Sequence, residues 1–251
     1  MPDKGRVSST MDRNNRSILL VDSSASLLFY LAMLLKRLEY KVMTARSAED
    51  AIRMMKETLP SIVVTELSLP FMSGIDFLRQ IKDTAGFKAV PVVVLTSESG
   101  SVTRETCMRT GCAAYIVKPV EPDVLYRTLQ SAVESVPREH IRMATSLKVV
   151  VGDGTAAGGA SRTEYATAIS EGGLFVRTLY PQPKNALTPI QIFINDDAVR
   201  AKAVVLYTYN LGEGPFKEPG MGMKFVEISD ADRAVIRKFI KDQLTRDIIS
   251  P

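Results

Sequence analysis

The stretch Ile62-Val63-Val64-Thr65-Glu66 decides the fold of the first half of the chain, because a short apolar run ends in a carboxylate. Two further runs have the same form: Ile18-Leu19-Leu20-Val21-Asp22 ends in an acid, and Val92-Val93-Val94-Leu95-Thr96 ends in a hydroxyl. Another apolar run, residues 113–117, leads into Lys118-Pro119. Continuous apolar runs separated by segments of helical period are typical of a parallel sheet covered on both faces. The polar residues after the runs are then expected to gather at the carboxyl ends of the strands.

The order of Asp22, Glu66, Thr96 and Lys118 resembles the CheY-like receiver domain of bacterial response regulators, over roughly residues 16–135. The resemblance implies an α/β domain with a doubly wound, parallel, five-stranded sheet. It also implies that Thr96 is the signalling hydroxyl and Lys118 the lysine that pairs with a phosphoryl group. Tyr115 matches the aromatic switch position. Taken singly, Tyr115 would be a packing residue and Thr96 a helix cap, but their joint placement at successive strand ends favours the functional interpretation.

Two positions depart from the receiver pattern. Glu66 stands where the family has its phosphate-accepting aspartate, and the acidic pair that holds magnesium reads Asp22-Ser23, which lacks one metal ligand. Phosphoryl capture needs nucleophile, cation and lysine in one geometry, where misplacement by about 1 Å can cost roughly a hundredfold. Hard cations need several oxygen ligands. We therefore expect an unphosphorylated receiver with no bound metal, and a salt bridge from Lys118 to Glu66 that freezes the switch or imitates its active state.

We expect a domain boundary near Ser135-Val136-Pro137, because proline disfavours helix at the preceding residue and the composition of the chain changes there. Short runs rich in β-branched and aromatic residues follow and predict a small barrel, with strands expected over 147–151, 173–178, 190–194, 201–209 and 223–228. Ser229 and Asp232 form a capping-box pattern ahead of an apolar helical face, which predicts a terminal helix.

The predicted organisation therefore has four parts. They are a disordered leader over residues 1–16, a receiver-like domain over 17–135, a linker over 136–146, and a β-barrel with its C-terminal helix over 147–251.

Two short signatures indicate a ligand for the second domain. Arg138 and Arg142 lie four residues apart just before the first predicted barrel strand, and Ser170-Glu171-Gly172-Gly173 forms a turn between two strands. A guanidinium group binds phosphate oxygens in pairs, hydrogen-bonds the O6/N7 edge of guanine and stacks on bases. The spacing alone is weak, since Arg233 and Arg237 repeat it in the terminal helix.

The placement of these signatures resembles the PilZ domain, the bacterial receptor module for cyclic di-GMP, over roughly residues 137–248. The resemblance implies that Arg138, Arg142, Ser170 and Gly173 bind the nucleotide. The family has Asp or Asn two residues before the serine, and here that position is Ala168. One lost hydrogen bond costs roughly 0.5 to 1.5 kcal/mol, or up to about 3 with a charge involved, so affinity is expected to fall by about one to two decades.

Composition limits the remaining function classes. The chain has 251 residues, 45% of them apolar, and a net charge of +4, which is too weak to argue for binding to DNA. Cys107 and Cys112 are expected to be reduced thiols. Without an export signal or an apolar stretch of about 20 residues, we expect a cytoplasmic protein with no membrane insertion. The sequence pairs no nucleophile with a base, which argues against an enzyme.

Two functional hypotheses follow. In the first, the barrel is a cyclic di-GMP receptor and the receiver is a docking or dimerising module, with another signalling or motility protein, or a second copy of the chain, as partner. In the second, both domains have lost their small-molecule chemistry and act as a protein-interaction scaffold, as Ser23, Glu66 and Ala168 suggest. A conventional phosphorylation-driven regulator comes third, because Glu66 argues against it.

Overall fold

The computed structural model describes residues 16–134, 137–155, 160–214 and 217–248. The chain divides into two compact units, one extending to Glu139 and the other formed by His140–Leu244, and each is described by itself. The predicted leader, apart from Arg16, and Ser135-Val136 at the predicted break lie outside the described residues.

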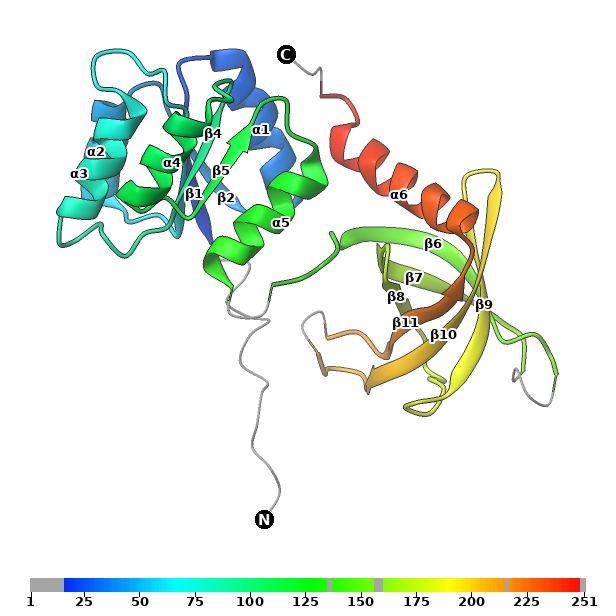
Figure 1. Cartoon of the computed structure of the whole chain (residues 1–251). Coiled ribbons are helices and arrows are strands. Elements are labelled where there is room, and N and C mark those ends of the chain that lie inside the picture. The colour runs from blue at the N-terminus through cyan, green and yellow to red at the C-terminus, as the bar shows by residue number, and fades with distance from the viewer. Residues whose placement is uncertain (1–15, 135–136, 156–159, 215–216, 249–251) are drawn as a thin grey trace. The chain divides into compact units, whose positions relative to one another are not determined.

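The first unit contains a parallel sheet with the strand order β2-β1-β3-β4-β5 (Figure 1). Helices α2, α3 and α4 cover one face, and α1 and α5 cover the other. The prediction of a doubly wound, five-stranded receiver fold is confirmed. In chain order the elements are β1 (Ser17–Val21), α1 (Ala25–Arg37), β2 (Lys41–Ala45), α2 (Ala48–Glu57), β3 (Ile62–Thr65), α3 (Gly74–Asp83), β4 (Val92–Thr96), α4 (Ser101–Thr110), β5 (Ala114–Val117) and α5 (Pro122–Val133).

The sequence explains why these elements form. Strands β3 and β4 are buried along their whole length, as expected for central strands covered on both faces. Serine side chains start three of the helices, because Ser24, Ser47 and Ser73 each accept a hydrogen bond from a backbone amide of the first turn. Cys107 and Cys112 are buried free thiols in this core.

The described residues of the second unit form a closed antiparallel barrel in the order β10-β11-β8-β7-β6-β9 (Figure 1). The prediction of a small barrel followed by a helix is confirmed. The elements are β6 (Met143–Val151), β7 (Arg162–Ser170), β8 (Gly173–Arg177), β9 (Leu187–Ile194), β10 (Asp197–Tyr209), β11 (Gly220–Ile228) and α6 (Asp230–Thr245). Ser229 caps the helix as expected, because its hydroxyl accepts from the Asp232 amide at 3.0 Å. The Asp232 carboxylate accepts from the Ser229 hydroxyl at 2.7 Å, where a full capping box would have it accept from the Ser229 backbone amide.

Several barrel strands differ from the sequence prediction. Strands β9, β10 and β11 begin at Leu187, Asp197 and Gly220, three or four residues before their predicted starts. Strand β6 begins at Met143, four residues before the predicted start, because its first residues pair with β7 across a register shift between Ala144 and Leu147.

Strand β7 was not among the strand ranges that we predicted. Its β-branched and aromatic residues, Thr163, Tyr165, Thr167 and Ile169, alternate with other residues, and its buried side chain at Ala166 is small, so it has no continuous apolar run.

Candidate functional site

In the first unit, the carboxyl ends of three parallel strands bring together two acids and a lysine. Lys118, after β5, places its Nζ 2.7 Å from Asp22 Oδ2 and 2.5 Å from Glu66 Oε2. Both carboxylates are buried, with exposures of 6% and 7%. The predicted salt bridge between Lys118 and Glu66 is therefore confirmed, and Asp22 shares the same ammonium group.

The second oxygen of each carboxylate is also engaged. Glu66 Oε1 accepts from the backbone amides of Leu67 at 2.6 Å and Ser68 at 3.3 Å. Asp22 Oδ1 accepts from the Ser24 amide at 2.8 Å. Burial raises the pKa of Glu66, but hydrogen bonds from Lys118, Thr96 and the Leu67 amide outweigh burial, so the pKa lies below its ordinary value. Glu66 is thus held as a carboxylate at neutral pH.

The predicted signalling residues lie around this cluster. The Thr96 hydroxyl bonds Glu66, and its oxygen accepts from the Glu98 amide at 3.3 Å. Tyr115 is 8% exposed, and its hydroxyl donates to the Glu98 carbonyl at 2.8 Å. The single carboxylate of Glu66 therefore contacts both the hydroxyl of β4 and the lysine that follows β5.

A magnesium ion, which the receiver fold implies, fits these residues poorly. All four oxygens of Asp22 and Glu66 already accept N–H donors, and Lys118 supplies the positive charge that a cation would bring. Ser23 is exposed at the third acidic position. Within the described residues, no group of three or more histidine, cysteine or acidic side chains is placed to hold a metal.

In the second unit, the turn between β7 and β8 carries two of the predicted nucleotide-binding residues. The Ser170 hydroxyl donates to the Gly173 carbonyl at 3.1 Å and so closes the turn. A side chain at Gly173 would overlap the backbone of Met223, so this glycine allows β8 and β11 to approach closely. The Phe225 amide also donates to the Gly172 carbonyl at 3.0 Å. The turn is therefore shaped before any ligand contacts it.

Helix α6 holds the same turn, which sequence reasoning missed. Arg233 Nη1 donates to the Glu171 carbonyl at 2.7 Å, and Arg237 forms an ion pair with Glu171 Oε2 at 3.0 Å. The ring of His140 packs against Gly172, where any side chain would overlap it. The only sequence signal for these contacts was the second Arg-x-x-x-Arg spacing.

The other predicted binding residues lie as follows. Arg142 is exposed and directly precedes β6, while Arg138 is half-buried, two residues before the second unit begins. Ala168 lies on β7 and pairs in register with Ala144 of β6 and Phe175 of β8. The position where the family has an acidic or amide side chain is therefore a short apolar position beside an aromatic ring.

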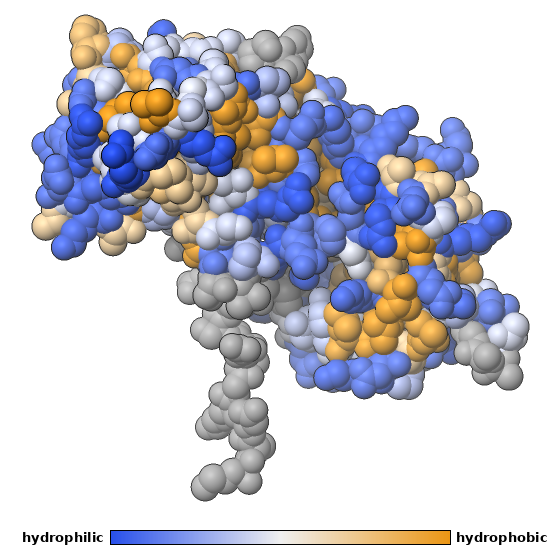
Figure 2. Space-filling model, viewed as in Figure 1, coloured by the Kyte–Doolittle hydropathy of each residue, from blue (hydrophilic) through white to orange (hydrophobic). Residues whose placement is uncertain are grey.

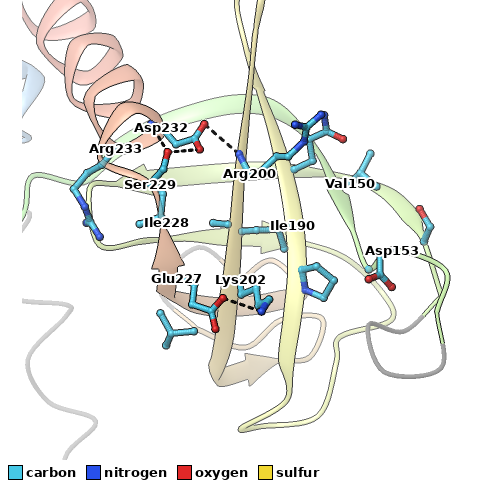
Figure 3. Close-up of a pocket in the computed structure, with 16 residues that line it drawn as sticks. Val150, Asp153, Ile190, Arg200, Lys202, Glu227, Ile228, Ser229, Asp232 and Arg233 are labelled. Carbon is cyan, nitrogen blue, oxygen red and sulfur yellow. Dashed lines mark hydrogen bonds and ion pairs between the residues drawn. The ribbon is translucent and has the colours of Figure 1, made fainter.

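A separate groove of about 950 Å³ lies on the barrel, along β9, β10, β11 and the start of α6 (Figure 3). Its charged side chains come in both signs. Lys202 Nζ pairs with Glu227 at 2.8 Å, and Asp232 accepts from the Arg200 amide at 3.4 Å. Because acids and bases alternate in it, the groove does not select ligands of one charge.

The parallel sheet with its charged cluster and the barrel with its β7–β8 turn define a chain with two regulatory domains. A family model described as the response regulator receiver domain matches residues 18–130, and one described as the PilZ domain matches residues 137–242. The chain therefore combines a receiver domain over residues 18–130 with a PilZ domain over residues 137–242, two domains that are typical of signal-transduction proteins.

Curated relatives match about half of the chain. PilH of Pseudomonas aeruginosa is 25% identical over 114 residues, covering 45% of this chain and 94% of PilH. The ycf27 protein of Pyropia yezoensis is 30% identical over 139 residues, covering 55% of this chain and 54% of ycf27. AfsQ1, a transcriptional regulatory protein of Streptomyces coelicolor, is 27% identical over 135 residues, covering 54% and 59%. The match thus spans little more than half the length of ycf27 and of AfsQ1.

Solved structures cover a similar share of the chain. A response regulator receiver domain protein from Clostridium thermocellum is 28% identical with a TM-score of 0.44, covering 47% of this chain and 94% of that one. The chemotaxis protein CheY4 of Vibrio cholerae is 24% identical with a TM-score of 0.45, covering 47% and 98%. In the part of the chain that the structure describes, no helix is long and apolar enough to cross a membrane.

Proposed function

We propose that this chain is a cyclic di-GMP receptor of the cytoplasm whose barrel binds the nucleotide through Arg138, Arg142, Ser170 and Gly173. The observation that carries the proposal is the exposed Arg142, which enters β6 next to the strand that ends in a preformed turn. A guanidinium group recognises phosphate and guanine through charge-assisted pairs of hydrogen bonds. Those contacts do not require a carboxylate at Ala168. The chain acts as a receptor and not as an enzyme.

The receiver domain in this proposal is a fixed module that is not phosphorylated. Glu66 already contacts Thr96 and Lys118, the two groups that the family pattern assigns to the phosphoryl group. Its carboxylate also lacks the vacant oxygens that a metal-assisted transfer needs. The fixed receiver serves for docking another signalling or motility protein or for pairing with a second copy of the chain.

Calorimetry with cyclic di-GMP tests the receptor proposal. We expect the native chain to bind, Arg142→Ala to lose binding, and Arg200→Ala to bind as the native chain does. Arg200 is a suitable control because it is an exposed arginine on the same barrel that lies in the groove of Figure 3. If the native chain binds nothing at high micromolar nucleotide, the scaffold alternative, which Ala168 favours, replaces the receptor.

Intact-mass spectrometry tests the receiver proposal. After incubation with acetyl phosphate and magnesium, we expect the native chain to keep its mass. Glu66→Gln serves as the matched control, because it removes the carboxylate while keeping the side-chain length. A phosphoryl adduct on the native chain that is missing from Glu66→Gln would overturn the proposal.

A further inference from the structure

Three aromatic rings gather on the outer face of the barrel. Phe175 of β8 and Tyr207 of β10 are stacked at 24° with ring centres 6.5 Å apart. Tyr209 lies 5.1 Å from Tyr207 and 6.2 Å from Phe175. Tyr207 remains 36% exposed, and the other two rings are half-buried. We call Phe175, Tyr207 and Tyr209 the ring cluster; part of its surface faces solvent.

Two glycines of β11 allow the rings to lie on the sheet. A side chain at Gly222 would overlap the Tyr207 ring, and one at Gly220 would overlap the Phe175 ring. Both glycines belong to the strand between β8 and β10. The cluster is therefore one broad aromatic surface, because β11 places no side chain between the rings at Gly220 and Gly222.

The strand register places the ring cluster beside the candidate nucleotide site. Ala168, Phe175, Gly222 and Tyr207 pair in one row across β7, β8, β11 and β10. Phe175 lies two residues after Gly173 on β8, so the two residues lie on the same face of the sheet. The ring cluster is therefore next to the turn on that face.

Arg142 lies next to the same row of residues. It directly precedes β6, and Ala144, two residues further along, pairs with Ala168 of that row. Burial and the neighbouring Tyr207 raise the pKa of Tyr209, and the positive charge of Arg142 partly opposes them, in keeping with this placement.

We propose that the ring cluster is a stacking platform for a guanine base of the nucleotide, with Phe175 and Tyr207 as affinity-determining contacts. This inference rests on the proposed receptor function and adds a part of the site that neither the Arg138–Arg142 pair nor the Ser170–Gly173 turn contains. An aromatic ring offers a base a contact that needs no hydrogen-bond partner. Stacking on the platform thus supplies binding energy next to Ala168, where the side chain can offer the base no hydrogen bond.

A purely structural role for the rings makes a different prediction. Aromatic side chains that cover glycines also stabilise sheets. In that case replacing a ring would lower the thermal stability of the barrel and leave the environment of a bound base unchanged. The test therefore needs a signal from the base itself.

Proton NMR of cyclic di-GMP with the full-length chain supplies that signal. A base stacked on aromatic rings has its guanine H8 resonance shifted upfield on binding. We expect Tyr207→Leu and Phe175→Leu each to weaken binding by about tenfold and to reduce this shift. Tyr207→Phe keeps the ring and should restore both. Tyr180→Leu is the matched control, because Tyr180 is an exposed barrel tyrosine that contacts Arg162 outside the cluster.

The outcomes distinguish the stacking platform from the proposed receptor function. If the native chain binds and Arg142→Ala does not, while both leucine variants keep the native affinity and H8 shift, the platform is overturned and the receptor stands. If the native chain fails to bind, the receptor function is overturned and the platform falls with it. If a leucine variant fails to fold, the H8 resonance of the nucleotide bound to the native chain still tests the proposal. An H8 resonance that does not shift on binding contradicts stacking.

Discussion

The charged site of the receiver and the outer face of the barrel use their polar groups in opposite ways. In the receiver, Asp22, Glu66 and Lys118 satisfy one another, and backbone amides occupy the remaining carboxylate oxygens. In the barrel, Arg142 is exposed beside a turn that the Ser170 hydroxyl closes by a hydrogen bond to the Gly173 carbonyl. A site whose charges are all paired internally has little to offer a ligand, whereas an exposed charge beside a rigid turn is available for binding.

Removing the lysine should produce the largest effect. In Lys118→Met two buried carboxylates lose their counter-charge, and breaking a buried ion pair in this way costs about 3–5 kcal/mol. We expect urea unfolding, followed by circular dichroism, to show the receiver destabilised by about that amount. Lys88→Met is the control, because Lys88 is exposed on the same domain. Equal stability of the two variants would mean that the receiver site is not held together by its charges.

Restoring the acid at position 168 should have the next largest effect, on the barrel. Ala168→Asp is expected to tighten cyclic di-GMP binding by up to about tenfold, since one recovered hydrogen bond is worth roughly 1 kcal/mol. Ala144→Asp adds the same charge at the paired position of the neighbouring strand and should not tighten binding. If calorimetry finds no gain for Ala168→Asp, the base does not contact this position.

Loosening the turn should have a smaller effect. Arg233→Ala removes the hydrogen bond to the Glu171 carbonyl, so the turn loses part of its support from α6. We expect affinity for cyclic di-GMP to fall by about threefold to tenfold, on the scale of one hydrogen bond. Lys238→Ala, at an exposed position of the same helix, should leave affinity unchanged. Equal affinities of the two variants would show that the turn does not need the helix.

Acid should have the smallest effect, through protonation of Glu66 in the receiver. Because the pKa of Glu66 is lowered in the folded chain, its stabilising contribution is complete above the ordinary glutamate pKa of about 4.3 and is lost as pH falls through the folded value. The pKa of Lys118 is raised by hydrogen bonds to Asp22 and Glu66 that outweigh burial, so its contribution persists up to about pH 10.4 and is lost at higher pH.

Thermal melts of the native chain and of Glu66→Gln between pH 3 and 8 measure the acid effect, because this range extends below and above the ordinary glutamate pKa of about 4.3. The gap between the two melting curves should be constant near neutral pH and close in acid. A gap that stays constant down to the lowest pH would mean that ionisation of Glu66 does not stabilise the receiver.

Sequence reasoning worked best where burial is complete. The runs that became β1, β3 and β4 are apolar at nearly every position, and their polar ends marked the receiver site. Strand β7 was harder to predict, because a barrel interior accepts the small side chain of Ala166 and needs no apolar run there.

The ring cluster and the support of the turn from α6 could not be predicted in the same way. Phe175 meets Tyr207 only through the register of three strands, and Glu171 meets Arg237 across 66 positions of sequence. No local pattern encodes either contact. The spacing of Arg233 and Arg237 does not by itself indicate that both side chains contact Glu171 of the turn.

The bracing of the β7–β8 turn also has a kinetic consequence. The Ser170 hydroxyl closes this turn, and Phe225, Arg233 and His140 contact it from other parts of the chain, so the conformational entropy of ordering the turn is lost during folding and not on binding. A nucleotide that meets such a turn needs no slow rearrangement before it docks. Variants of this surface should therefore associate at similar rates and differ in how long the nucleotide stays bound.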